Sequence, residues 1–501
     1  MSFKILDCTL RDGGYYNKWN FSLDFAKKYS STLKKAKIDI LEIGFRKQNQ
    51  FKEKDKLFLY SHENTLKKIK FDKDQIVSVM VDLSDFKNIK EIENLKKSFP
   101  ERQKSSVSLI RLACNYDDMN LLEAVVKILK EKKYLIAVNL MKFTLLKNNS
   151  IVIFFKHAEK LNVDYFYLAD SLGNCKPIDL IKLSKILKKE FLIKKFGFHA
   201  HDNLGLALSN SIAAINQGFG IIDTSINGMG RGAGNLKLEE LLKREKKIKE
   251  LTIIKKFIKN KILSLKRKYN WGTNIYYKKS AKNNIHPTFI QRLIEEKKYN
   301  NKVIKRIIKF LGNTKSSSYD ANIFDNLFLK NSLVKKKSYN LENKEILIIG
   351  AANTSDNLKK YIFHNKNKYL LATLNYNAKI NQKFIDYVFI CNPYRIITET
   401  NLIKDKKIIM PNISELFKKK NNKFIYYNID HNKKLSIKKT KCSFSKNMVL
   451  FYCLAFCIAN KFKKIKIINI SKNSINKLII RQIAQYLKKK SVATKLEYSF
   501  I

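Results

Sequence analysis

Residues 196–217 read FGFHAHDNLGLALSNSIAAINQ, a short apolar run followed directly by a stretch with helical periodicity. The same unit recurs through the first 240 residues. Near-continuous apolar runs of this kind indicate strands that are buried on both faces. Eight strands that alternate with helices predict a (β/α)8 TIM barrel; the alternative, an open doubly wound sheet, rarely has eight such regular units. The eight runs cover residues 3–10, 39–45, 76–82, 108–114, 135–141, 164–170, 196–202 and 221–227.

The rest of the chain divides into three further parts. Residues 241–330 have a helical pattern and form a predicted extension of the barrel at 1–240. Residues 331–344 are polar and rich in Lys, as in a linker. A second α/β pattern begins at 345 and predicts a smaller Rossmann-like domain to residue 501.

The composition is that of a globular protein with an unusual charge. The chain has 100 Lys and Arg against 43 Asp and Glu, a formal net charge of +57. Such a charge raises the alternative of a polyanion-binding protein on an inactive barrel. However, the cations are mostly Lys and are spread along the whole chain, whereas nucleic-acid recognition relies on Arg. We therefore expect a solvated surface and no nucleic-acid partner.

Three features of the chain predict a cytoplasmic protein with no membrane partner. No run approaches 18 uncharged apolar residues, and the N-terminus lacks the pattern of a secretory signal. The seven cysteines include no CxxC pair, which indicates reduced thiols.

The seventh apolar run contains the strongest chemical signal. His199 and His201 are two residues apart, so they face the same side of the predicted strand, at its carboxyl end. Active sites of these barrels lie at that end. Two imidazoles there form a platform for a metal ion, and Asp12, just after the first strand, can add a carboxylate. This donor set suits Mn2+, Mg2+, Fe2+ or Zn2+ with positions left open for a substrate.

Other polar residues follow the remaining strands. Arg11 beside Asp12 can stabilise an enolate oxygen as charge develops on it. The loop NGMGRGAGN (227–235) lets backbone approach a ligand, and Asn235 could add an oxygen to the metal. Glu42 and Asp170 are candidates either for support of these residues or for buried pairs that only hold the barrel together. The other polar groups at strand ends are Arg46, Arg111, Asn139 and Ser171.

Four motifs together resemble one family. CTLRDGG (8–14), EIGF (42–45), FHAHDNLGLALSN (198–210) and NGMGRGAGN resemble the pyruvate carboxyltransferase, or HMG-CoA-lyase-like, superfamily, the DRE-TIM metallolyases. The most similar group is that of the 4-hydroxy-2-oxovalerate aldolases. The resemblance covers residues 1 to about 240 and extends more loosely to about 330.

The resemblance implies a barrel that binds one divalent ion, with Mn2+ or Mg2+ favoured over Zn2+ or Fe2+. Asp12, His199 and His201 match the ligand positions, and Asn235 matches a ligand of some members. Arg11 matches the arginine that stabilises the enolate. Ser171 falls where a small polar residue contacts the carboxylate of the keto acid, and we expect Arg111 to help bind the substrate.

One position departs from the family. The aldolases have a catalytic histidine where this chain has Tyr15, and the relatives that condense acetyl-CoA have RDGEQ where it has RDGGY. A Tyr of ordinary pKa, about 10, is a weak base at neutral pH. The base is then Tyr15 with a lowered pKa, a metal-bound hydroxide, or another group. His286, which could instead cap a helix at Pro287, is one candidate, and Tyr276 or Tyr277 is another.

These residues predict a carbon–carbon lyase or aldolase that acts on a 2-keto acid and an aldehyde through an enolate. The alternative within enzymes is Claisen-type transfer of an acyl group from acyl-CoA to a 2-keto acid. The resemblance also suggests a homodimer.

The second domain carries a weaker signal. ILIIGAANTSDNLKKYI (346–362) has a strand, a turn and a helix but lacks GxGxxG, so a dinucleotide site is not indicated. Ser355 and Asn353 could cap the helix, and Arg395 could bind an anion. Fold analogy alone suggests a nucleotide or sugar-nucleotide ligand.

Overall fold

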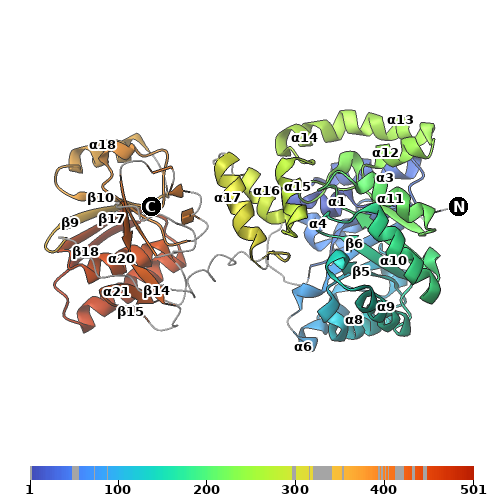
Figure 1. The fold of residues 1–501 in the computed structure, drawn as a ribbon, viewed down its shortest axis with the longest axis horizontal. Coiled ribbons are helices and arrows are strands. Elements are labelled where there is room, and N and C mark those ends of the chain that lie inside the picture. The colour runs from blue at the N-terminus through green and yellow to red at the C-terminus, as the bar shows by residue number, and fades with distance from the viewer. Residues whose placement is uncertain are drawn as a thin grey trace. The chain divides into compact units, whose positions relative to one another are not determined.

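The chain folds into two compact units (Figure 1). The computed structural model describes residues 3–47, 56–72, 74–86, 88–295, 301–314, 316–319, 341–352, 355–392, 395–396, 399–400, 402–403, 406–411, 423–430, 435–443 and 448–500. One unit comprises Met1–Lys298 and Ile308–Tyr319, and the other Tyr299–Ile307 and Asp320–Ile501.

The first unit is built on a closed barrel of eight parallel strands in sequence order. β1 closes the barrel by pairing with β8, with Leu6 opposite Asp223. The predicted (β/α)8 fold is therefore confirmed. The strands are β1 Lys4–Asp7, β2 Ile40–Phe45, β3 Ile76–Asp82, β4 Leu109–Cys114, β5 Leu135–Met141, β6 Tyr165–Asp170, β7 Phe196–Ala200 and β8 Ile221–Thr224.

The helices between the strands are amphipathic and turn one face to the barrel. In α8, Leu122, Val125, Val126 and Leu129 are buried, a spacing that places them on one helical face. The longer connecting helices are α3 Leu23–Lys35, α8 Met119–Glu131, α9 Asn148–Lys160, α10 Pro177–Glu190 and α11 Ala207–Asn216. Short helices are α1 Thr9–Asp12, α2 Gly14–Asn17, α4 Leu57–Tyr60, α5 Glu63–Leu66, α6 Ile89–Ile92 and α7 Leu95–Ser98.

Further helices follow β8 (Figure 1). They are α12 Leu238–Arg244, α13 Ile248–Phe257, α14 Leu263–Tyr269, α15 Ile275–Lys282, α16 Pro287–Glu295 and α17 Asn301–Gly312. A π-helical turn, Ile258–Ile262, joins α13 to α14. The boundary between the two compact units falls within α17.

Alternate residues of each strand point into the barrel and fill it in layers. The lowest layer is apolar and includes Leu6, Ile40, Leu109, Tyr167 and Ile221. Two residues further along the strands, the inward side chains are charged: Glu42, Arg111 and Asp223, all fully buried. The Arg111 guanidinium lies 4.3 Å from the Tyr167 ring, so the charged layer rests on the apolar one. One step further, Ala113, Asn139 and Ala169 line an open cavity.

The second unit contains an open sheet of seven parallel strands in the order β13-β12-β11-β10-β9-β17-β18. The order reverses at β9, as in doubly wound folds. The strands are β9 Glu345–Ile349, β10 Leu370–Leu374, β11 Tyr387–Phe389, β12 Lys407–Met410, β13 Phe424–Tyr426, β17 Lys464–Ile470 and β18 Lys495–Phe500. A small second sheet contains β14 Asn428–Asp430, β16 Lys441–Ser443 and β15 Ser436–Ile437.

Helix α20, Val449–Ala459, packs on β10 and β11, and nine of its residues, Leu450 to Ile458, are buried. The other long helices of this unit are α18 Asp356–Asn365 and α21 Ser474–Lys489. The prediction of a second α/β domain is confirmed. The predicted cap at Ser355 is also present, since its side chain accepts the backbone N–H of Leu358.

Some expectations differ or lie outside the described residues. Arg395 does not present a free cation for an anion, because its Nη1 lies 2.6 Å from Glu399 Oε1. Asn353 and most of the proposed linker at 331–344 lie outside the described residues.

Candidate metal centre

Three predicted ligands converge at the carboxyl end of the barrel. Asp12 ends α1, directly after β1, while His199 lies in β7 and His201 follows it. One donor atom from each lies within 4.8 Å of the other two, and all three residues are buried. Nε2 of each histidine is 4.0 Å from Asp12 Oδ2. The three donors therefore surround one point from different sides.

The donor set fits a divalent cation. Burial lowers the pKa of His201 well below its ordinary value, so its ring is neutral at neutral pH, the form that binds metals. Burial alone would raise the pKa of Asp12, but Arg11 and the two histidines hold it below its ordinary value, so the carboxylate is charged. Two imidazoles and one carboxylate, open to a cavity on one side, are a recognised donor set for ions that also bind a substrate.

Asp223 fixes the orientation of His199. Its Oδ2 lies 2.9 Å from His199 Nδ1, which leaves Nε2 to face Asp12. A carboxylate on the second ring nitrogen is typical of metal-binding histidines. Asp223 was not among the predicted site residues. Its signal was its place in IIDTSIN, where an inward carboxylate interrupts the apolar run of a buried strand.

Buried arginines and acids form a continuous network below the ligands. Arg11 Nε donates to Glu42 Oε2 at 2.7 Å, and its Nη1 donates to Asp12 Oδ1 at 2.6 Å. Arg111 bridges Glu42, at 3.0 Å, and Asp223, at 2.5 Å. Each acid has a cationic partner, which offsets the cost of removing these charges from water. Glu42 thus has the supporting role that was one of its two predicted alternatives.

Asn235 approaches the ligands from the glycine-rich loop. Its Nδ2 donates to Asp12 Oδ2 at 2.7 Å, while its Oδ1 is buried without a hydrogen-bond partner among the described residues. The loop needs glycine to pass here: a Cβ on Gly230 would meet the Asn235 amide at 2.5 Å, and Gly234 has φ +85°. Asn235 is therefore adjacent to the centre, with an oxygen still available to an ion.

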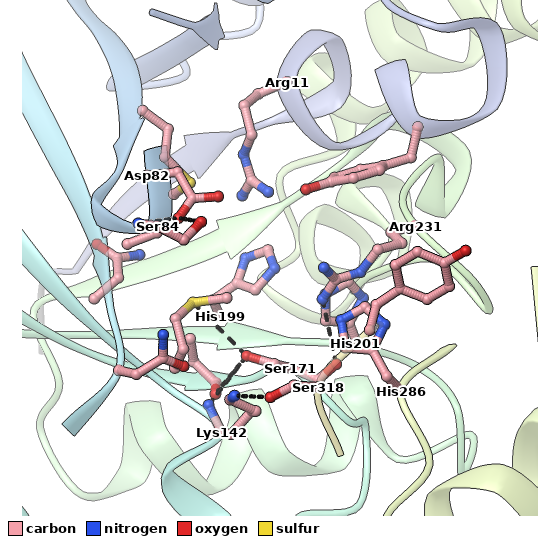
Figure 2. Close-up of a pocket in the computed structure, with 18 of the residues that line it drawn as sticks. Arg11, Asp82, Ser84, Lys142, Ser171, His199, His201, Arg231, His286 and Ser318 are labelled. Carbon is pink, nitrogen blue, oxygen red and sulfur yellow. Dashed lines mark hydrogen bonds between the residues drawn. The ribbon is translucent and has the colours of Figure 1, made fainter. Parts of the chain in front are cut away.

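A cavity of about 300 Å3 opens over the centre (Figure 2). Five predicted residues line it: Arg11, Tyr15, Ser171, His199 and His201. So does His286, whose Nδ1 accepts the backbone N–H of Thr288 at 3.3 Å, at the start of α16. His286 thus has both predicted properties, since it faces the cavity and also bonds to the first turn of a helix. Burial lowers its pKa well below the ordinary value.

Three residues lie elsewhere than expected. Arg111, predicted to bind the substrate, does not line the cavity: it is fully buried in the charged layer and pairs with Glu42 and Asp223. Tyr277 is buried and does not line the cavity, and its hydroxyl lies 3.4 Å from that of Tyr16. Asp170 accepts the backbone N–H groups of Asn174 and Cys175 and holds the turn after β6.

Sequence reasoning missed several residues of the cavity wall. Arg231, Lys142 and Asp82 line it, beside Asn139, whose polar side chain at a strand end was noted in the sequence. Arg231 stands in the glycine-rich loop, with its guanidinium 5.2 Å from the Tyr15 ring. Lys142 and Asp82 come at the carboxyl ends of β5 and β3, the position at which a site residue is expected.

Comparison with known proteins agrees with this geometry. The model of the family described as HMGL-like matches residues 2–262. A 4-hydroxy-2-oxovalerate aldolase from Thermus thermophilus is 25% identical over 249 residues, which are 47% of this chain and 67% of that protein.

Solved structures show the same architecture. The N-terminal domain of a candidate aldolase from Bacteroides vulgatus is 32% identical with a TM-score of 0.53, and the match covers 61% of this chain and all of that domain. The carboxyl transferase domain of pyruvate carboxylase from Rhizobium etli, 13% identical with a TM-score of 0.50, shares the fold over 64% of this chain and 56% of that one.

The resemblance inferred from the four motifs is confirmed, and with it the prediction of an enzyme of the carbon–carbon lyase class. The family match covers more than half of the chain and all eight strands of the barrel. This chain belongs to the HMGL-like family.

Proposed function

We propose that the barrel is a divalent-metal-dependent aldolase that makes or breaks the bond between carbon 3 of a 2-keto acid and the carbon that comes from its second reactant. Its second reactant is an aldehyde. The observation that carries this proposal is the convergence of Asp12 with His199 and His201, two residues that line the same cavity as Arg11. Mn2+ or Mg2+ is the proposed ion, with Zn2+ or Fe2+ as alternatives.

A bound divalent ion would act as a Lewis acid toward the keto oxygen. Arg11 adds a second positive charge at the same place. Its guanidinium is fixed by Glu42 and Asp12, so little reorganisation is needed when charge develops on the substrate oxygen. Ser171 offers its hydroxyl to the carboxylate of the keto acid, and the backbone N–H of Lys142 holds Ser171 Oγ at 3.1 Å.

Bond formation requires two proton movements. A base removes a proton from carbon 3 of the keto acid, carbon 3 then bonds to the aldehyde carbon, and the aldehyde oxygen takes a proton. We assign the first transfer to Tyr15 in its phenolate form, which takes the proton and becomes the neutral hydroxyl. It lines the cavity one turn from Arg11, and its hydroxyl has no hydrogen-bond partner in the described part of the chain.

His286 suits the opposite role. Because its Nδ1 accepts a backbone N–H and its pKa is lowered by burial, the neutral ring carries its proton on Nε2. We infer that it donates a hydrogen bond to the aldehyde oxygen.

The cysteines support a proposed setting in the cytoplasm. All seven cysteines are free and buried, as expected of a reducing compartment. Among the described residues no helix is long and apolar enough to cross a membrane. The family resemblance supports a homodimer, and the dispersed lysines give no reason to propose a nucleic-acid partner.

The test is exchange of the methyl protons of pyruvate in D2O, followed by NMR after the metal is chelated. Exchange should require added Mn2+ or Mg2+ and should fall to the uncatalysed rate in His199→Ala, because enolate formation needs the complete centre. Lys185→Gln, on the exposed face of α10, is the control for a substitution outside the cavity and should exchange normally. Metal bound without exchange of pyruvate, or exchange that survives His199→Ala, would contradict the proposal.

A further inference from the structure

Two cations of the cavity wall have no acidic partner among the residues that the structure describes. Arg231 and Lys142 both line the cavity, and in the described ranges neither forms an ion pair with any carboxylate. The polar contacts of their side chains are to neutral groups: Arg231 Nη2 to the Ser171 carbonyl at 3.4 Å, and Lys142 Nζ to Ser318 Oγ at 2.7 Å. Figure 2 shows both side chains directed into the cavity around Ser171.

The metal centre does not need these charges. Its buried network holds two arginines and three acids, a net charge of minus one: Arg11, Arg111, Asp12, Glu42 and Asp223. A divalent ion with neutral histidines changes this to plus one, and the carboxylate of a bound 2-keto acid then brings it to zero. The charges of Arg231 and Lys142 remain uncompensated after the centre is filled.

The carboxylate that lines the cavity does not compensate them either. Asp82 accepts from Lys47 at 3.1 Å and from Ser84 at 2.6 Å. Lys47 also pairs with Asp85 at 2.7 Å. This acidic group therefore has its own cation, and it lies beyond ion-pair distance of Arg231 and Lys142.

Arg231 is held in place despite the cost of burying an unpaired charge. It is only 7% exposed, and its Nε has no hydrogen-bond partner in the described structure. An unpaired charge in such a place costs several kcal/mol unless a ligand supplies the counter-charge. A guanidinium with free N–H groups facing a cavity is suited to bidentate binding of a carboxylate or phosphate.

The position of Lys142 is also fixed by the surrounding structure. Its backbone has φ +53°, in the left-handed region that residues with a side chain seldom adopt. This conformation directs its N–H to Ser171 Oγ and its side chain to Ser318. Burial lowers the pKa of Lys142, and the nearby Arg231 lowers it further, whereas the more distant charges of Asp118, Asp117 and Asp82 raise it without forming an ion pair.

We propose that Arg231 and Lys142 bind a second anionic group of the substrates, a carboxylate or a phosphate, in addition to the carboxylate beside the keto carbon. This inference rests on the proposed function. The group belongs either to the keto acid, at its far end, or to the aldehyde. A second positive wall also sets this cavity apart from one built for a small neutral aldehyde.

The test compares pairs of compounds that differ in that group. For the keto acid, the pair is 2-oxoglutarate and 2-oxovalerate, compared by calorimetric binding to the Mn2+-loaded protein, which needs no turnover. For the aldehyde, the pairs are glyceraldehyde 3-phosphate with glyceraldehyde and succinate semialdehyde with butanal, compared by the rate of pyruvate consumption. The pair that shows a preference identifies which substrate carries the anion.

We expect the anionic member of at least one pair to be preferred by about tenfold or more, the effect of one charge-assisted contact or better. Arg231→Gln and Lys142→Gln should each reduce that ratio toward one, whereas Lys185→Gln should preserve it. Equal affinity for the two keto acids, together with equal rates of pyruvate consumption within each aldehyde pair, overturns the inference. So does a preference that persists in both variants, or an equal loss for both members, which would assign these cations to the carboxylate of the keto acid itself. Absence of pyruvate exchange in the unmodified protein would instead remove the proposed function, and the inference with it.

Discussion

The barrel and the C-terminal unit are both parallel α/β structures, but their interiors differ in charge. The barrel buries nine described Asp, Glu and Arg residues: Asp7, Arg11, Asp12, Glu42, Arg46, Arg111, Asp170, Asp223 and Arg231. In the described part of the C-terminal unit, Glu399 alone is buried among these types. Closure explains the charged layer of Glu42, Arg111 and Asp223, because a barrel directs alternate side chains of eight strands toward one axis, whereas an open sheet spreads them over two faces.

The difference shows that the barrel, far more than the described part of the C-terminal unit, contains the buried charges that lower the free energy of unfolding. Buried charges cost free energy that a neutral core does not, and they persist only if each finds a partner or a ligand. In the barrel, most are paired around the metal ligands. We therefore expect the reaction to depend on the barrel interior and to be insensitive to the neutral core of the C-terminal unit.

Tyr15→Phe gives the largest expected effect on the reaction beyond loss of the metal ligands. Removing the hydroxyl should lower the rate of pyruvate exchange by about a hundredfold or more, the usual contribution of a positioned acid or base. Metal affinity measured by calorimetry should not change, since Tyr15 lies outside the ligand set. Tyr269→Phe, a hydroxyl removed from α14 outside the cavity, is the control. Exchange at the normal rate in Tyr15→Phe would exclude this tyrosine as the base.

Asp223→Asn tests the residue that orients His199. Loss of this carboxylate should weaken Mn2+ binding by about 10- to 100-fold, as for other carboxylates on metal-bound histidines. Excess Mn2+ should restore much of the exchange, which separates a positioning role from a chemical one. Asp179→Asn, on the exposed first turn of α10, should leave the affinity unchanged. An unaltered affinity in Asp223→Asn would show that His199 does not need this contact.

Because the Asp170 carboxyl is buried, we expect the stability of the barrel to depend on pH. Burial raises its pKa to about 7, against hydrogen bonds from Cys175, Asn174 and Gly173 that lower it. The folded state thus retains a proton that the unfolded chain loses near pH 4. The contribution of protonated Asp170 to the free energy of unfolding is complete below about pH 4. It is lost as pH rises through about 7, by at most about 1.4 kcal/mol per pH unit.

The measurement is denaturant unfolding between pH 5 and 8 for the natural protein and Asp170→Asn. Both tryptophans, Trp19 and Trp271, belong to the barrel unit, so their fluorescence reports this unit alone. Because the buried histidines contribute with the opposite sign, the difference between the two proteins isolates Asp170. The advantage of the natural protein should shrink as pH rises, and a constant difference would contradict the assignment.

Gly350→Ala should have the smallest effect on the reaction, namely none. A Cβ at Gly350 would meet the Asn469 carbonyl oxygen at 2.3 Å, so β9 and β17 must shift, at a cost of about 1–3 kcal/mol. Unfolding of the C-terminal unit, followed by circular dichroism, should begin at a lower denaturant concentration. The unfolding of the barrel followed by tryptophan fluorescence, and the rate of pyruvate exchange, should not change. A parallel loss of exchange would show that the two units are coupled.

Sequence patterns predicted the barrel and the ligands because both depend on local rules. Period-two alternation places His199 and His201 on one face, and the strand-end rule places Asp12 beside them. The height of a side chain within the barrel depends instead on strand tilt and stagger, which a single strand does not record. Arg111 therefore read as a substrate contact, although it lies one layer below the cavity and pairs with Asp223.

The other differences have similar causes. Glycines around Arg231 permitted a loop but did not determine where its guanidinium points. Strand β18 (KLEYSF) and the small sheet were not expected, because they are short or polar and resemble connecting segments. Their pairing is decided by tertiary contacts and not by local preference.

The buried cysteines allow the unfolding of the two units to be followed separately. Cys8, Cys114 and Cys175 lie in the barrel unit and the other four in the C-terminal unit, all enclosed in the fold. Burial raises the pKa of Cys8 and Cys114, so thiolate forms only when the surrounding structure opens. A thiol reagent followed by mass spectrometry would therefore add three labels when the barrel opens and four when the C-terminal unit does. The order in which the three and the four labels appear would show which unit of the natural protein unfolds first.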